Sequence, residues 1–120
     1  MPLRSYKELV VWQRSIELTI EVYRLTSLYP KSELFGLTAQ SRRAAIGIPS
    51  NISEGYSRKS RLDYAHFINI AFASGAELET QLIIAKKLKL TDQKEFEKAE
   101  HLLQEVMSML NVLEYKIRQK

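Results

Sequence analysis

Apolar residues recur at spacings of three and four along most of this chain, and this period restricts its fold more than any other feature. The repeat is clearest in the last quarter of the chain, where each of its positions is apolar: Phe96, Ala99, Leu103, Val106, Leu110, Leu113 and Ile117. Glycine and proline are scarce, at 4 and 3 residues, and fall mostly between the periodic segments. The pattern predicts amphipathic helices joined by short connections and gives no support for strands.

Capping residues and prolines mark the limits of the first two expected helices. A capping box, Ser5-x-x-Glu8, opens the first helix, which is expected to end near residue 28 because Pro30 follows. The second helix is expected to run from residue 32 or 33 to Gly55. Because Pro49 lies inside it and removes one backbone hydrogen bond, a kink rather than a stop is predicted near residues 45–48.

The second half of the chain contains two further expected helices. The third opens at another capping box, Ser60-x-x-Asp63, and extends to about residue 88, and the fourth begins after residue 91 or 92. Four helices with connections of a few residues predict one domain over residues 1–120, an all-α, up-down-up-down antiparallel four-helix bundle. A long two-helix hairpin, the alternative, requires fewer interruptions than this sequence contains.

The first helix carries two apolar stripes, although one is sufficient for the core of a bundle. One stripe contains Leu9, Trp12, Ile16, Ile20 and Tyr23, and the second contains Val11, Leu18, Val22 and Leu25. The third and fourth helices also carry apolar residues beyond their expected core faces: Phe67, Phe72, Ile83, Leu102 and Met109. We expect further copies of the chain to cover the second stripes, which predicts a homo-oligomer. The alternative is a monomer whose apolar faces are wide.

The formal net charge is +4, and the excess of basic residues lies in the first half of the chain. Five basic residues fall between positions 42 and 61, where Glu54 is the single acid: Arg42, Arg43, Arg58, Lys59 and Arg61. A basic patch is typical of contact with a polyanion, so these five are the candidate nucleic-acid-binding residues.

Two other interpretations of the basic residues stay open. They can form ordinary solvated surface, or Arg42 and Arg43 can pair structurally with Glu54, Glu77 or Glu79. Lys86, Lys87 and Lys89 form a second basic group. In an up-down bundle this group is expected at the end opposite the connection between the second and third helices.

The chain lacks the patterns on which most catalytic and cofactor sites depend. It has no cysteine, two histidines, and no Glu-x-x-His motif of the kind found in di-iron bundles. It also has neither a Gly-x-Ser-x-Gly elbow nor a glycine-rich phosphate loop. A non-enzyme without metal or cofactor is therefore predicted. Since no apolar run approaches the roughly 18 residues of a membrane span and no secretory signal is recognisable, we expect a cytoplasmic protein without a membrane partner.

Four polar residues fall near the expected core faces of the second and third helices: Asn51, Glu54, Ser74 and Glu77. Burying such groups is costly unless they form hydrogen bonds. Pro49 deprives the carbonyl of Ala45 of its usual donor, so a side-chain donor is expected nearby. We predict that Asn51 and Glu54 fasten this bent helix end to the third helix or to a neighbouring subunit.

Trp12 and three segments carry a resemblance to a known family. The segments are Gln40-x-Arg42-Arg43-Ala44, Pro49-x-Asn51-Ile52-x-Glu54-Gly55 and Ser74-x-x-Glu77-Leu78-Glu79. Over nearly its whole length the chain resembles the ribosomal-protein-like family of four-helix bundles encoded by intervening sequences in bacterial 23S ribosomal RNA genes. The resemblance implies a homopentamer of antiparallel bundles around a central axis. It also implies a fold similar to that of the accessory protein of diversity-generating retroelements, which is associated with a reverse transcriptase and with nucleic acid.

Charge and resemblance together suggest two functions. The first is a pentamer that binds nucleic acid, in particular structured RNA, through a basic patch repeated in every copy. The second is a protein-interaction scaffold, or an accessory subunit of an RNA-processing or reverse-transcriptase complex. The sequence leaves open which RNA or protein is the ligand.

Overall fold

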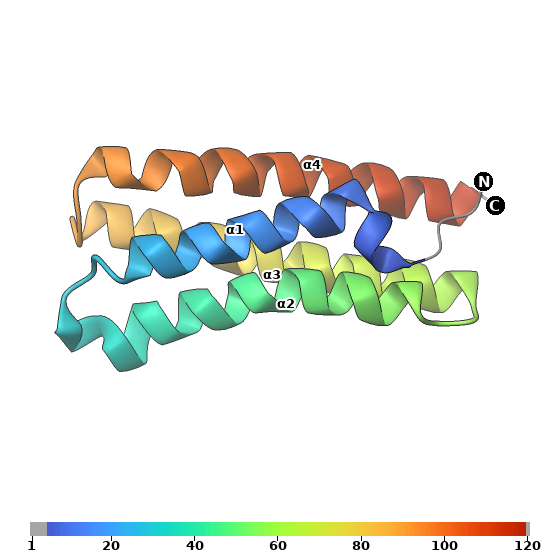
Figure 1. The fold of residues 1–120 in the computed structure, drawn as a ribbon, viewed down its shortest axis with the longest axis horizontal. Coiled ribbons are helices and arrows are strands. Elements are labelled where there is room, and N and C mark those ends of the chain that lie inside the picture. Colours follow the sequence, from blue (N-terminus) through green and yellow to red (C-terminus); the bar gives the residue numbers. More distant parts are fainter. Residues whose placement is uncertain (1–4, 120) are drawn as a thin grey trace.

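In the computed structural model, residues 5–119 are described, and four long helices run alternately up and down (Figure 1). These are α1 (Val10–Thr26), α2 (Ala39–Tyr56), α3 (Arg61–Lys87) and α4 (Glu97–Gln119). Each helix packs against two others, in the cyclic order α1, α2, α3, α4. The α2–α3 connection lies at the same end as the start of α1 and the end of α4, and the other two connections lie at the opposite end. The predicted all-α four-helix architecture is confirmed.

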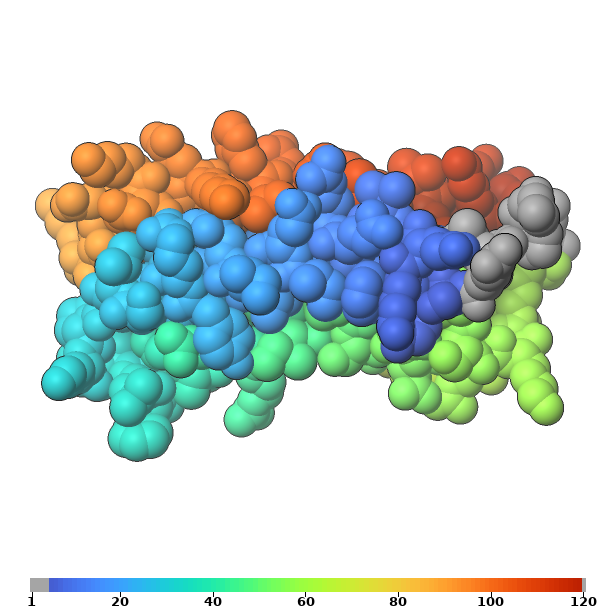
Figure 2. Space-filling view, in the orientation of Figure 1, coloured from blue at the N-terminus to red at the C-terminus, as the bar shows by residue number. Residues whose placement is uncertain are grey.

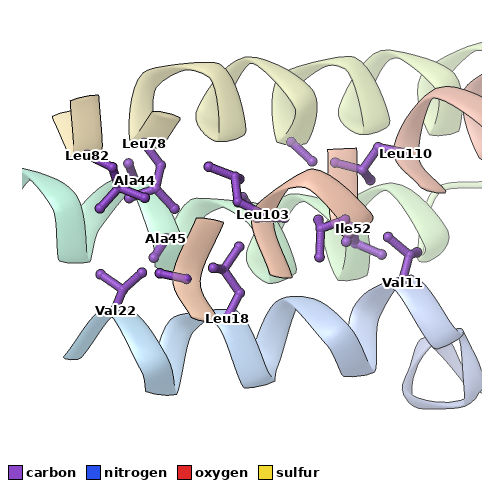
Figure 3. Close-up of a cluster of buried hydrophobic side chains, with 14 of the residues drawn as sticks. Val11, Leu18, Val22, Ala44, Ala45, Ile52, Leu78, Leu82, Leu103 and Leu110 are labelled. Atoms are coloured by element: carbon purple, nitrogen blue, oxygen red, sulfur yellow. The ribbon is translucent and has the colours of Figure 1, made fainter. Parts of the chain in front are cut away.

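The core is a continuous cluster of apolar side chains contributed by all four helices. In Figure 3 these side chains point into the shared interior: Val11, Leu18 and Val22 from α1, Ala44, Ala45 and Ile52 from α2, Leu78 and Leu82 from α3, and Leu103 and Leu110 from α4. The repeat predicted on the fourth helix is confirmed as a core seam, because Leu113 is half-buried and its other members are buried. Among residues 5–119, no helix has both the length and the apolar character needed to cross a membrane.

The first helix buries the stripe that was predicted to be surplus. Its buried apolar residues are Val11, Leu18, Val22 and Leu25, whereas Ile20 on the other stripe is 67% exposed. Ser15 and Thr26 extend the buried stripe, because each hydroxyl donates a 2.7 Å hydrogen bond to a carbonyl of its own helix. Both residues are polar by hydropathy, so the sequence alone shows only the apolar members of this stripe. The apolar surplus of α1 therefore lies on the side of Ile20 and Tyr23, and the prediction was wrong.

α1 also begins later than predicted. The Ser5 hydroxyl accepts a 3.1 Å hydrogen bond from the backbone N–H of Lys7, but this cap opens only a single 3-10 turn, η1 (Tyr6–Glu8). Leu9 has an extended backbone, with φ −72° and ψ 126°, and separates that turn from α1. At the other end α1 stops at Thr26, two residues before the predicted limit.

The start of the second helix is irregular rather than α-helical. A 3-10 turn, η2 (Lys31–Glu33), and a π-helical turn, η3 (Leu34–Thr38), precede α2. Gly36 departs from helical geometry, with φ −105° and ψ −113°. As a result Leu34, which was expected on the core stripe, is exposed, and Phe35 is 92% exposed.

The third and fourth helices start close to the predicted positions. The Ser60 hydroxyl accepts a 3.2 Å hydrogen bond from the backbone N–H of Asp63, which confirms the capping residue of α3. A 3-10 turn, η4 (Gln93–Phe96), follows Asp92 and leads directly into α4.

α2 continues through Pro49, as predicted, and a side chain of α1 lies at the carbonyl that the proline leaves free. The Thr19 hydroxyl lies 3.2 Å from the carbonyl oxygen of Ala45 and 2.8 Å from that of Ser15. Because a hydroxyl has one proton, the two carbonyls share a single donor. The predicted side-chain donor for Ala45 is therefore Thr19.

Glycines on α2 and α3 allow neighbouring helices to approach closely. A Cβ atom added to Gly55 would lie 2.8 Å from Cβ of Phe67 and 3.2 Å from the backbone oxygen of Tyr64, both fixed parts of α3. A Cβ atom added to Gly75 would instead meet the side chain of Met107. The thioether chain of methionine is flexible, so the two sites should differ in their tolerance of a methyl group.

We expect Gly55→Ala to lower the free energy of unfolding by about 1–3 kcal/mol, because α2 and α3 must separate to admit the methyl group. Gly75→Ala is the matched control. There Met107 can rotate away, and a gain of about 1 kcal/mol in helix propensity offsets the disturbance. Urea denaturation at one protein concentration measures both variants, and equal destabilisation would contradict the difference between the two contacts.

Thr19→Val should lower the free energy of unfolding by about 1 kcal/mol, because the carbonyl of Ala45 loses its donor. In a Pro49→Ala background the backbone N–H of residue 49 can bond to that carbonyl, so the same substitution should cost less. A double-mutant cycle measured by urea denaturation gives the difference. Strictly additive costs would show that Thr19 does not compensate for the proline.

Candidate nucleic-acid interface

The five candidate basic residues lie at two ends of the bundle instead of forming one patch. Arg42 and Arg43 lie in the first turn of α2, whereas Arg58, Lys59 and Arg61 follow its last turn. Arg42 and Arg58 are 16 positions apart, which corresponds to roughly 24 Å along a helix. The clustering seen along the sequence is therefore not a clustering in space.

Arg42 is a structural residue that binds the last turn of α1. Its Nε donates a 2.9 Å hydrogen bond to the hydroxyl of Thr26, and Nη2 lies 3.4 Å from the carbonyl oxygen of Tyr23. Its guanidinium also lies 4.5 Å from the centroid of the Tyr23 ring. A cation is favourable at this position because the carbonyl end of a helix carries partial negative charge. The structural interpretation holds for Arg42, but with partners on α1 in place of the predicted glutamates.

Arg43 is exposed and forms no ion pair with the described residues. It lies beside a shallow apolar hollow. The other residues that line this hollow are Tyr23, Leu34, Phe35, Thr38, Ala39, Arg42 and Ile46. An apolar surrounding of this kind is unusual for a phosphate-binding arginine. Arg43 and Arg42 therefore both lie apart from the residues best placed to bind RNA.

The α2–α3 connection carries the three remaining candidates. Arg58 donates from Nη2 to Oε2 of Glu54 at 2.9 Å, and its guanidinium lies 4.6 Å from the ring centroid of Phe67. Lys59 and Arg61 are exposed and have no ion-pair partner within residues 5–119. Ser60, between them, caps α3. Lys59 and Arg61 thus extend into solvent at the N-terminus of a 27-residue helix.

Sequence reasoning missed three basic residues in elements at the same end of the bundle: Lys7 in η1, and Lys116 and Arg118 in the last turn of α4. Arg118 forms an ion pair with Glu114, whereas Lys7 and Lys116 are exposed. The topology could have identified them, because an up-down bundle places the start of its first helix and the end of its fourth beside the second connection. Among residues 5–119, six basic side chains and four acidic ones, Glu8, Glu54, Asp63 and Glu114, give this end a net charge of +2.

The second basic group lies at the opposite end, as predicted. Lys86 pairs with Glu100, with 3.0 Å between Nζ and Oε2, and Lys87 and Lys89 are exposed. Acidic residues of η4 and the start of α4 lie at this end too, and Glu95 also pairs with Arg24. Ion pairs with these acidic residues engage Lys86 and Arg24, which reduces the number of cations free to bind a polyanion at this end.

The four predicted structural polar residues bond differently from expectation. Nδ2 of Asn51 donates a 2.7 Å hydrogen bond to the carbonyl oxygen of Gly47 in its own helix, and Glu54 pairs with Arg58. Neither bond reaches α3, and attachment to a neighbouring subunit stays a prediction. Ser74 is half-buried against Gly47, where an added Cβ atom would lie 2.9 Å from its Oγ. Glu77 is exposed and does not face the core, because it lies on the solvent side of α3.

The aromatic residues beside the basic connection pack inward. The rings of Tyr56 and Tyr64 meet edge to face, with 5.8 Å between centroids. Burial, with a smaller effect of the Tyr56 charge, raises the pKa of Tyr64 to about 12, so its phenol stays neutral in any physiological range. Tyr64 is half-buried and packs against the apolar core, so it serves packing rather than base stacking. Within residues 5–119 no three His, Cys, Asp or Glu side chains are grouped to hold a metal ion.

The chain matches the family model described as 23S rRNA-intervening sequence protein over residues 7–112. Its fold is similar to the crystal structure of a protein of unknown function from the S23 ribosomal protein family of Bacteroides thetaiotaomicron. The two chains are 22% identical with a TM-score of 0.81, and the match covers 88% of this chain and 96% of the other. At that sequence identity, the structural similarity establishes a shared fold and nothing about function. No curated protein matches this chain.

We expect Arg42→Ala to lower the free energy of unfolding by about 1–2 kcal/mol, because it removes the hydrogen bond to Thr26 and the ring contact with Tyr23. Arg61→Ala is the matched control, since the same side chain is exposed there and its loss should change stability by less than about 0.5 kcal/mol. Urea denaturation measures both. Arg42→Lys should not restore stability, because an ammonium group lacks the planar fork of donors.

Proposed function

The chain belongs to the 23S rRNA-intervening sequence protein family, and from this premise we propose that it is a non-enzymatic, cytoplasmic protein that binds structured RNA. The binding surface is the end of the bundle that carries the α2–α3 connection. The observation that carries the proposal is the position of Lys59 and Arg61, two exposed cations without ion-pair partners among the described residues, at the start of α3. Arg58 in the α2–α3 connection, Lys7 in η1 and Lys116 in the last turn of α4 belong to the same end and add to its positive potential.

The chemistry of this surface suits a phosphate backbone. Lysine and arginine side chains neutralise phosphates whatever the base sequence. Base reading would need side chains that stack on unpaired bases, and Tyr64 packs against the core instead. We therefore propose recognition of RNA shape and backbone.

We propose further that the protein acts as a homo-oligomer, and specifically as the pentamer that the family resemblance implies. A net charge of +2 at one end of a single copy supports only weak binding. Repetition of the same end in several copies raises the apparent affinity through effective concentration, without any new contact. Exposed apolar residues on α1, η3 and α2 support self-association: Ile20, Tyr23, Leu34, Phe35 and Ile46.

A second candidate function is a scaffold or accessory subunit that docks an RNA-associated protein. The apolar hollow between η3, α1 and α2 favours this function, because an apolar hollow suits a protein better than it suits RNA. Recovery of the same partners from cell extracts before and after nuclease treatment would support this function. Loss of all partners on nuclease treatment would favour direct RNA binding.

Reversal of the two unpaired cations tests RNA binding. We expect Lys59→Glu/Arg61→Glu to weaken binding of a base-paired RNA stem-loop by at least tenfold and to make the dependence of log Kd on log salt shallower by about two units. The matched control is Lys87→Glu/Lys89→Glu, which makes the same change in charge at the other end and should alter Kd less than twofold. Fluorescence anisotropy at several salt concentrations measures both.

Two outcomes would count against this function. Absence of RNA binding by the wild-type protein at low salt would remove it altogether. Equal weakening in the test and control variants would show that net charge, rather than the end with the α2–α3 connection, governs binding.

A further inference from the structure

Phe35 is the most exposed large apolar side chain among the described residues. It lies in η3, whose segment forms the lower left corner of the space-filling view (Figure 2). The non-helical backbone of Gly36 interrupts the helix directly after it. Tyr23, Leu34 and Ile46 surround this position and are themselves partly exposed, so the side chain is part of a coherent apolar surface. We call Phe35 with Leu34 and Ile46 the knob.

A cavity lined by both apolar and polar side chains lies between α3 and α4, which form the face of the bundle opposite α1 and α2. Its apolar lining comes from Leu82, Ile83 and Leu103, and its rim carries Glu79, Glu100 and Gln104. Its volume is about 270 Å³. A cavity of about 150 Å³ already accepts a benzene ring, so the phenyl group of Phe35 fits. We call this cavity the groove.

The charges beside the knob and the groove are complementary. Arg43 is exposed at the edge of the knob, and Glu79 is exposed at the rim of the groove. Neither side chain forms an ion pair with any residue from 5 to 119. A second copy of the chain would supply each with a partner of opposite sign, which favours one orientation of the contact over others.

The knob and the groove also lie at nearly the same height along the bundle. Contact between Gly47 and Ser74 sets α2 against α3, and in antiparallel helices this places residue 40 level with residue 81, the middle of the groove. Phe35 is five residues away, which corresponds to roughly 8 Å at a rise of 1.5 Å per residue. Two copies can therefore lie side by side with a small axial shift.

We infer that the knob of one copy inserts into the groove of a second copy, with Phe35 against Ile83 and Arg43 against Glu79. This inference rests on the self-association proposed above and names the surfaces that form it. Because the knob and the groove are different surfaces, the contact is heterologous, and each copy can hold two neighbours. Such a contact closes into a ring when the rotation between neighbours permits, which suits an assembly of five.

Complementary disruption of the two surfaces tests the inference. Phe35→Asp removes the knob, Ile83→Asp fills the groove with a charge, and each variant alone should be monomeric by light scattering. Mixed in equal amounts, the two should form a heterodimer, because one intact knob and one intact groove remain. The control, Leu62→Asp, alters a residue that is 64% exposed at the start of α3 and should keep the wild-type mass.

Charge exchange gives a second measurement in which the apolar contact stays intact. Arg43→Glu alone and Glu79→Arg alone should each weaken assembly at least tenfold, and the double variant should recover most of it. Circular dichroism and thermal melting confirm folding, which is expected because all substituted side chains are exposed.

The outcomes separate this inference from the proposals beneath it. A wild-type oligomer whose mass is unchanged by Phe35→Asp would overturn the inference while leaving RNA binding and assembly standing, and would assign the knob to another occupant. Two monomeric variants that fail to combine on mixing would also overturn it. A monomeric wild-type protein would contradict both the proposed assembly and this inference. Absence of RNA binding by an intact oligomer would contradict the proposed function alone.

Discussion

The close contact between α2 and α3 is the constraint on which the rest of this bundle depends. Gly55 lies against the backbone of Tyr64 and Gly47 lies against Ser74, so two points on one helix are matched to two points on the other. Any sliding of one helix along the other would bring larger residues into these contacts. The register that results sends the connection between Tyr56 and Arg61 to one end of the molecule, and it also sets the height of η3 relative to the middle of α3.

The sequence could predict four helices, their order and most of the core, because these depend on period and capping. It could not predict which face of α1 is buried. That choice depends on Ser15 and Thr26, whose hydroxyls bond to carbonyls of their own helix and so enter the core at little cost. Nor could it predict the irregular turn at Gly36, because a glycine near a helix start has no single backbone conformation that its neighbours dictate.

The candidate site was less predictable than the fold because charge was counted along the chain. Arg42 and Arg43 are adjacent in sequence but have different environments. Arg42 is bonded to the end of α1, whereas Arg43 lies at the edge of the apolar hollow between η3, α1 and α2. Lys7 in η1 and Lys116 in the last turn of α4 come from opposite ends of the chain, and yet these two segments lie beside the α2–α3 connection (Figure 1). Residues 16 positions apart on one helix are separated by roughly 24 Å. Only the packed bundle therefore shows which cations share a surface.

Assembly and RNA binding are compatible in this molecule because they use different parts of it. The knob and the groove lie on the sides of the bundle, away from the end that carries Lys59 and Arg61, so association leaves that end open. Copies that associate side by side with little axial shift direct their basic ends the same way. Each end has a net charge of only +2, and a ring of such ends would present a common cationic face to one RNA. Affinity would then depend on the number of copies more than on the strength of any single contact, which is how a weakly charged surface can hold a polyanion.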